Sequence, residues 1–300
     1  MLSYFIARGE TQDLDRLSRV RLPGSYVALS DGVTHYQLSG PKDGELVLLL
    51  PGLTIPLFYW SKFAEQLHRS GYRTLSFSAY GRGYSDRIRS AYTKQLFLKQ
   101  AKELVEAVSD AEIKHVIATS MGALVAMSLV IDGWINPETL TLVGPAGISS
   151  QIPLAVRIAR TRWVAELFGK FLGSKGVVDH LNHNVLAEEH AVELKKMVGE
   201  AFKHKGSMYS LLSTLRNFPL YGQQELFWRA GDLELPKLLL WGAEDQVTPV
   251  SGMPIVKSLL RPRESHIIHD CGHMAPFEHP EIVSSLFIDF VQNLKTKPAS

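Results

Sequence analysis

Three residues of this 300-residue chain could together perform nucleophilic chemistry: Ser120, Asp245 and His273. A neutral serine hydroxyl is a poor nucleophile, so it needs an imidazole that removes its proton as it attacks a carbonyl carbon. An acid that is hydrogen-bonded to the imidazole would fix its tautomer and stabilise the imidazolium. The three residues are far apart in sequence, so this chemistry requires a fold that brings them together.

Ser120 lies where a strand pattern changes into a helix pattern. The apolar run His115–Ala118 precedes it, and a helix-like stretch of small and apolar residues follows Gly122. A serine on such a tight turn is thrust out at the carboxyl edge of a sheet, and small neighbours are needed because the turn is crowded. The alternative is a serine that only caps the N-terminus of the helix.

The acid and the histidine also follow strand-like runs. Residues 237–241 form an apolar run just before Asp245, and residues 266–269 end shortly before His273. Because open parallel sheets bind ligands beyond the carboxyl ends of their strands, groups on such loops can converge. Glu244 is the alternative acid.

Apolar runs of strand length recur along the chain and alternate at first with helical stretches. The runs are residues 46–50, 73–77, 115–118, 139–143, 237–241 and 266–269, and the first helices are expected at 58–69 and 93–108. This alternation predicts an α/β fold with a mostly parallel, doubly wound sheet.

An antiparallel hairpin is expected before the first of these runs. Residues 27–29 and 33–36 flank Asp31-Gly32, a dipeptide that supplies positive φ in tight hairpin turns. The sheet is therefore predicted to begin with an antiparallel pair.

The order serine, acid, histidine and the loop context of each residue resemble the α/β-hydrolase family. The resemblance implies that Ser120 is the nucleophile, His273 the general base and Asp245 the acid that orients it. It also implies an oxyanion hole formed by the backbone N–H groups of Leu53 and Met121. At residue 51, the family usually has a histidine that ties the oxyanion loop down, whereas this chain has proline.

Residues 81–86 resemble the family's Gly-x-Gly-x-Ser-Asp loop, with Ser78 where aspartate is common. We predict a structural role for this loop. Its spacing does not fit the phosphate-binding Gly-x-Gly-x-x-Gly pattern, so no nucleotide cofactor is expected.

Strand patterns disappear between residue 147 and about residue 231, where helical periodicity replaces them. We therefore predict a hydrolase core of residues 1–147 and 231–300 and an inserted helical cap of residues 148–230 that closes over Ser120. The cap positions with this periodicity are Leu154, Ile158, Ala165, Phe168 and Leu172. Residues 152–172 also mix apolar and basic side chains as membrane-surface helices do, so weak membrane contact through the cap is an alternative.

The leading functional hypothesis is hydrolysis of a small-molecule ester through an acyl-enzyme, as in capped carboxylesterases and monoacylglycerol lipases. A membrane-binding cap would favour a lipid ester. The resemblance leaves open carbon–carbon bond hydrolysis of a ring-cleavage dienoate, for which the arginines of the cap could bind a carboxylate. A non-catalytic ligand-binding protein on the same fold is a second alternative.

Several other classes are disfavoured. The net charge is only +2 with acidic and basic residues interleaved, so a nucleic-acid partner is not expected. Cys271 is the only cysteine and cannot form an internal disulfide, and no apolar run approaches the ~20 residues that span a bilayer. The N-terminus lacks the pattern of a signal peptide, so we predict a cytoplasmic protein.

Two groups of histidines could suggest a metal site. The first group, with one aspartate, is His266, His269, Asp270 and His273, on or near one strand, where alternate side chains point to opposite faces and cannot easily converge. The second group is His180, His183 and His190, in the insertion. We predict no metal site.

Overall fold

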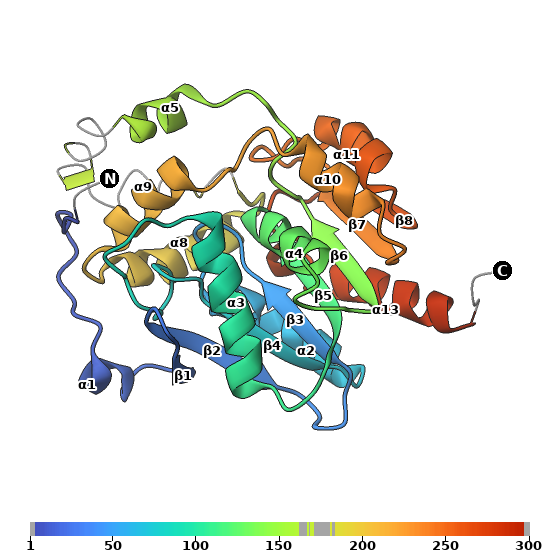
Figure 1. Cartoon of the computed structure of the whole chain (residues 1–300), viewed down its shortest axis with the longest axis horizontal. Coiled ribbons are helices and arrows are strands. Elements are labelled where there is room, and N and C mark those ends of the chain that lie inside the picture. The colour runs from blue at the N-terminus through green and yellow to red at the C-terminus, as the bar shows by residue number, and fades with distance from the viewer. Residues whose placement is uncertain (1–3, 162–166, 168, 171–180, 182–183, 297–300) are drawn as a thin grey trace.

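The computed structural model describes residues 4–161, 167, 169–170, 181 and 184–296 of the chain (Figure 1). Its centre is one eight-stranded sheet with the order β1-β2-β4-β3-β5-β6-β7-β8. The strands are β1 (Ser25–Ala28), β2 (Val33–Ser39), β3 (Leu46–Leu50), β4 (Arg73–Phe77), β5 (Ile113–Thr119), β6 (Thr139–Val143), β7 (Lys237–Gly242) and β8 (Glu264–Ile268).

Strand directions divide the sheet into two parts. β1 and β2 form an antiparallel hairpin, and β2 pairs antiparallel with β4. From β4 to β8 every neighbouring pair is parallel. Every residue of β3, β6 and β7 is buried, as expected for strands of a parallel sheet that is covered on both faces. The predicted mostly parallel sheet with an N-terminal hairpin is confirmed.

The predicted reason for the hairpin turn is wrong. Neither Asp31 nor Gly32 has a positive φ. Instead, a Cβ at Gly32 would lie 3.0 Å from both Cβ and Oδ2 of Asp86. Glycine is needed here because another loop approaches closely, and the turn is closed by a hydrogen bond from Leu29 N to Gly32 O of 2.9 Å.

Helices cover both faces of the sheet (Figure 1). The central helix α4 (Met121–Ile131) is buried on all sides over residues Met121–Leu129, and its sequence is accordingly almost wholly apolar. One face carries α2 (Ser61–Arg69), which follows the 3₁₀ helix η1 (Leu57–Trp60), and α13 (Pro280–Thr296), which follows α12 (Ala275–Glu278). The other carries α3 (Lys94–Val108), α4 (Met121–Ile131), α10 (Gln224–Gly231) and α11 (Met253–Leu260), which follows η3 (Val250–Gly252).

Between β6 and α10 the described residues contain helices and no strand. These helices are α5 (Leu154–Arg160), α8 (Glu188–Phe202) and α9 (Ser207–Asn217), and Figure 1 shows them grouped at one end of the molecule. Of the cap positions expected from the helical periodicity, Ala165, Phe168 and Leu172 lie outside the described residues. The division into core and cap stays a prediction.

The N-terminal segment lies against these helices rather than against the sheet. The buried carboxylate of Glu10 accepts hydrogen bonds from Gly206 N at 2.8 Å and Met208 N at 2.6 Å, where α9 begins. Gln12 N donates to Lys203 O at 3.0 Å. The short helix α1 (Arg16–Arg19) follows. Among the helices that the structure describes, none is long and apolar enough to cross a membrane.

Candidate active site

Ser120 lies on a strained turn between β5 and α4. Its φ of 50° and ψ of −119° are unusual for a non-glycine residue, at a cost of about 1–3 kcal/mol. Backbone hydrogen bonds hold it on both sides: Ser120 N donates to Val143 O at 3.2 Å, and Ser120 O accepts from Ala123 N at 3.1 Å and from Ala146 N at 3.2 Å. Its side chain forms no capping hydrogen bond with α4, so the helix-cap interpretation is not supported.

The residues beside Ser120 must be small because the turn packs tightly against the loop after β3. A Cβ at Gly122 would lie 2.5 Å from Leu50 O and 2.7 Å from Pro51 O. A Cβ at Gly52 would lie 3.4 Å from Ser120 Cβ. The start of α4 and the loop that contains Leu53 are therefore neighbours.

The two backbone amides predicted for an oxyanion hole belong to these neighbouring segments. Met121 N–H is at the first position of α4, where a helix leaves its amides without intrahelical acceptors. Within the described part of the chain, neither Met121 N–H nor Leu53 N–H donates to a protein acceptor. Both groups can therefore donate to a ligand.

The predicted acid and base are in direct contact. Asp245 Oδ2 lies 2.8 Å from His273 Nδ1, and both residues are 5% exposed. The other carboxylate oxygen, Oδ1, accepts hydrogen bonds from Val247 N and Thr248 N, each 2.8 Å long. These contacts fix the orientation of the carboxylate, which in turn fixes the imidazole with Nε2 free to act.

Glu244, the alternative acid, has a different partner. Its Oε2 accepts a hydrogen bond from Cys271 N at 3.0 Å. This contact supports the loop after β8, two residues before His273. The geometry therefore selects Asp245 over Glu244 as the partner of the imidazole.

Ser120 approaches the Asp245–His273 pair through the end of β6. Val143 O accepts from Ser120 N, and a Cβ at the next residue, Gly144, would lie 3.1 Å from Asp245 Oδ2 and 3.4 Å from His273 Nδ1. No hydrogen bond joins Ser120 Oγ to His273 in the described part of the chain. Such contacts are often long before a substrate binds.

Sequence reasoning missed Thr248. Its hydroxyl oxygen lies 2.9 Å from Asp245 Oδ2, 3.1 Å from Gly144 O and 3.2 Å from His273 Nδ1. The signal available in the sequence was the spacing, because a threonine three residues after an aspartate often closes a turn around the carboxylate.

Sequence reasoning also missed Glu278, which holds the His273 loop. This buried carboxylate accepts hydrogen bonds from Gly272 N at 3.1 Å, Met274 N at 3.2 Å and Leu186 N at 2.9 Å. Nothing in the local pattern marks it, since its three donors come from two separate segments. Glu278 therefore joins the His273 loop to the segment before α8.

The geometry supports neither redox chemistry at Cys271 nor a metal site. Burial raises the pKa of the Cys271 thiol, and its side chain is fully buried, so it is poorly suited to redox chemistry. Among the residues that the structure describes, no three histidine, cysteine, aspartate or glutamate side chains are grouped as metal ligands would be. His180 and His183 lie outside those residues.

Comparison with known proteins agrees with this architecture. Residues 47–286 match the α/β hydrolase family. The chain belongs to the α/β hydrolase family. Over 280 residues the hydrolase is 23% identical to the 2-hydroxy-6-oxononadienedioate/2-hydroxy-6-oxononatrienedioate hydrolase of Cupriavidus pinatubonensis, which covers 89% of this chain and 95% of that protein.

Solved structures share the fold of the hydrolase. A thermophilic esterase from Thermogutta terrifontis superposes with a TM-score of 0.75 at 20% identity, covering 90% of this chain and 99% of that one. A meta-cleavage product hydrolase superposes with a TM-score of 0.69 at 19% identity, covering 90% and 98%. The family and the fold predicted from the sequence are confirmed, whereas the individual roles of the site residues stay predictions.

Proposed function

We propose that this hydrolase attacks a carbonyl carbon with Ser120. His273 Nε2 accepts the hydroxyl proton as Ser120 Oγ bonds to carbon, and Asp245 stabilises the imidazolium that forms. The observation that carries this proposal is the buried 2.8 Å contact between Asp245 and His273 at the same sheet edge as the Ser120 turn. Water then cleaves the covalent intermediate with His273 acting again as base.

The negative charge that develops on the carbonyl oxygen needs donors. We assign this role to the backbone N–H groups of Leu53 and Met121. Both come from segments that pack against the Ser120 turn, and Met121 N–H adds the favourable dipole at the start of α4.

The leaving group decides the substrate class. The sequence favoured an ester, with carbon–carbon hydrolysis of a dienoate as the alternative. The curated relatives support the alternative, because they are named as 2-hydroxy-6-oxononadienedioate/2-hydroxy-6-oxononatrienedioate hydrolases. We therefore propose a carbon–carbon bond next to a ketone as the bond cleaved. Before cleavage the 2-hydroxy dienoate must tautomerise to its 2-oxo form, in which the hydroxyl proton is lost and a proton is added to the carbon that will leave. The electron pair of the broken bond then passes along the conjugated chain to the 2-oxo group as a dienolate, which is protonated in turn.

Ester hydrolysis is the second candidate, supported by the likeness of the fold to a thermophilic esterase. The same triad serves both reactions, because an ester expels an alkoxide that His273 protonates. A lipid ester bound through a membrane-contacting cap belongs to this candidate. The exposed Leu154 on α5 is the described cap residue most suited to such contact.

The test compares the two substrate classes on one enzyme. Turnover of a 2-hydroxy-6-oxo dienoate and of p-nitrophenyl esters of graded chain length should be measured for the wild type, Ser120→Ala and Ser128→Ala. Ser128 is a control because it is a buried serine on the helix that follows Ser120, and its hydroxyl donates to Leu124 O. We expect Ser120→Ala to lose at least about 10³-fold in kcat and Ser128→Ala less than about threefold.

The substrate profile then separates the candidates. A kcat/KM for the dienoate at least about 100-fold above the best ester would support carbon–carbon hydrolysis, and the reverse ratio would support the esterase. Loss of less than tenfold in folded Ser120→Ala would overturn the assigned nucleophile. No turnover of either class by folded wild type would favour a ligand-binding role.

A further inference from the structure

Arg82 is a buried cation beside the loop that contains Leu53. It lies in the loop after β4, and only 2% of its surface is exposed. Burial lowers the pKa of its guanidinium to about 10, so the group is still protonated at neutral pH. Taking a charge out of water is costly unless strong contacts compensate for the lost hydration.

The contacts of Arg82 join its own loop to the loop that contains Leu53 and to the helix α9. Its Nε donates to Leu53 O at 2.6 Å, its Nη1 to Tyr80 O at 3.0 Å and its Nη2 to Thr214 Oγ1 on α9 at 3.0 Å. The Leu53 contact is a charge-assisted hydrogen bond of the strong kind. It fixes the residue whose N–H is assigned to the oxyanion hole.

The acceptors of Arg82 are all neutral. Among the described residues no carboxylate forms an ion pair with it. Its guanidinium lies 5.9 Å from the ring centre of Tyr92 and 5.8 Å from that of Phe97, where a cation is attracted to the aromatic faces. An ordinary structural salt bridge therefore does not explain this buried charge.

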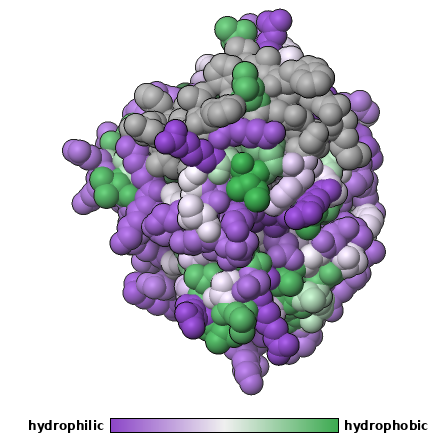
Figure 2. Space-filling view, turned by 90° about the vertical axis from the view of Figure 1, so that its left-hand side faces the viewer, coloured by the Kyte–Doolittle hydropathy of each residue, from purple (hydrophilic) through white to green (hydrophobic). Residues whose placement is uncertain are grey.

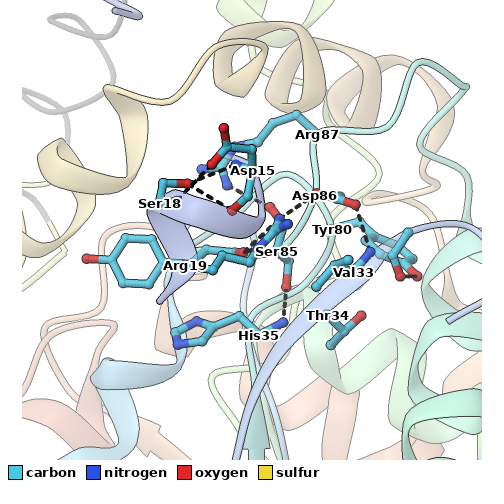
Figure 3. Close-up of polar contacts among 12 residues, drawn as sticks. Asp15, Ser18, Arg19, Val33, Thr34, His35, Tyr80, Ser85, Asp86 and Arg87 are labelled. Atoms are coloured by element: carbon cyan, nitrogen blue, oxygen red, sulfur yellow. Dashed lines mark hydrogen bonds and ion pairs between the residues drawn. The ribbon is translucent and has the colours of Figure 1, made fainter. Parts of the chain in front are cut away.

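The loop that carries Arg82 is itself anchored on the sheet. Ser85 Oγ accepts from His35 N at 2.9 Å, and Asp86 Oδ2 accepts from Val33 N at 2.7 Å. Figure 3 shows Ser85 and Asp86 pointing at these amides of β2. Arg82 therefore projects from a fixed support.

We propose that Arg82 is a positioning residue that holds the oxyanion loop, in place of the side chain that Pro51 lacks, and links this loop to α9. The inference rests on the proposed function, since it concerns the Leu53 amide of that site. Because one guanidinium contacts both Leu53 and Thr214, a shift of α9 is transmitted to the loop beside Ser120. Lysine cannot replace it, since an ammonium lacks the planar fork that reaches three acceptors.

Arg87 offers a matched control in the same loop. It too donates to two carbonyls and one hydroxyl, namely Ser85 O at 2.7 Å, Ala201 O at 2.8 Å and Ser207 Oγ at 3.1 Å. It makes no contact with the oxyanion loop. Arg82→Lys and Arg87→Lys therefore remove similar hydrogen bonds, but only one of them releases Leu53.

The experiment measures hydrogen exchange of the peptide that spans residues 51–57, together with kcat and KM for the substrate that the wild type turns over. In Arg82→Lys we expect faster exchange in this peptide and a fall in kcat of about 10–100-fold with KM changed less than about threefold. In Arg87→Lys we expect unchanged exchange there and kcat within about threefold. Thermal denaturation of both variants establishes that each is folded.

Two results would overturn the inference: unchanged exchange of residues 51–57 in folded Arg82→Lys, or equal losses of kcat in both variants. If Arg82→Lys does not fold, Thr214→Val replaces it, because that change removes one acceptor of the guanidinium and should raise loop exchange more weakly. An inactive wild type would refute the proposed function alone. The exchange comparison would still decide whether Arg82 holds the loop.

Discussion

Asp245 and Glu244 are adjacent acids that the fold uses differently. Asp245 contacts the imidazole of His273, whereas Glu244 accepts from Cys271 N in the next loop. Both acids lie in the turn after β7, which ends at Gly242, and this turn directs the two adjacent carboxylates to different loops. One carboxylate can therefore stabilise an imidazolium while its neighbour only supports the backbone.

Exchanging each acid for its amide separates these roles. Asp245→Asn should lower kcat by about 10³–10⁴-fold, because the amide stabilises neither the correct tautomer nor the imidazolium. Glu244→Gln should keep kcat within about fivefold and lower the free energy of unfolding by about 1–2 kcal/mol. Steady-state kinetics and urea denaturation measure the two effects. Equal losses of kcat in both variants would contradict the assignment of Asp245.

Sequence context could locate Ser120, Asp245 and His273 because each follows an apolar run that ends at the same sheet edge. It could not locate Arg82 or Glu278. Their partners come from segments far apart in the chain, Leu53 and Thr214 for Arg82 and Leu186 for Glu278. Such contacts depend on how loops lie in space, which no local pattern encodes.

At the scale of the elements, the turn after β6 lies between the Ser120 turn, which follows β5, and the Asp245–His273 pair. Gly144 has a φ of 48°, and a Cβ there would lie within 3.4 Å of both Asp245 Oδ2 and His273 Nδ1. Glycine is therefore required at this position for conformation and for space. Gly133, after α4, also has a positive φ of 69° but has open space around it.

Alanine at each glycine tests the requirement for space. Both Gly144→Ala and Gly133→Ala should lose about 1 kcal/mol of stability through the positive φ. Only Gly144→Ala should also lower kcat, by about 10-fold or more, because its methyl group displaces the Asp245–His273 pair. Thermal denaturation and kinetics of both variants check this. Full activity of Gly144→Ala would show that the pair tolerates the methyl group.

Among the secondary-structure elements, the strands were easier to predict from the sequence than the turns. β3, β4 and β6 match their predicted ranges, because each is a short stretch rich in apolar and β-branched or aromatic residues. The hairpin was located correctly, but its glycine is explained by the approach of Asp86 from another loop rather than by a positive φ. Close approach between loops is a tertiary property that a local pattern does not show. The Asp31-Gly32 pattern therefore predicted the turn but not the reason for its glycine.

In the whole molecule, the left-hand end of Figure 1 carries the N-terminal segment, α8 and α9. Two buried histidines are His35 on β2 and His204 in the loop between α8 and α9. Figure 2 shows that this face is largely hydrophilic, with separate apolar patches. Beneath it, burial lowers the pKa of both His35 and His204 to about 4. His35 fits its site as a neutral ring, with contacts to Ser78 Oγ at 3.1 Å and Pro23 O at 3.0 Å.

These histidines make folding stability depend on pH. Because both pKa values are lowered on folding, the unfolded chain binds protons more readily between pH 6.5 and pH 4. Their contribution to stability is thus complete above pH 6.5 and is lost as the pH falls toward 4. Each contributes up to about 1.4 kcal/mol per pH unit in this window. Urea denaturation at several pH values should show a shallower slope for His35→Gln than for the wild type, and an unchanged slope would contradict this account.

Contacts between distant segments join the helices after β6 to the loops around the predicted triad. The sheet edge carries Ser120, Asp245 and His273, whereas α9 and the segment before α8 contact the loops that hold them, through Thr214 to Arg82 and through Asn184 O to His273 N at 2.8 Å.

The central claim is that Ser120 is the nucleophile of this hydrolase, and one measurement tests it directly. A fluorophosphonate probe phosphonylates an activated serine irreversibly. Mass spectrometry then gives the mass of the labelled protein and identifies its modified peptide. The account predicts one adduct, located on Ser120, absent in Ser120→Ala and formed at least about 10³-fold more slowly in His273→Gln. Folded wild-type protein that takes no label, or carries it on another residue, would contradict the claim.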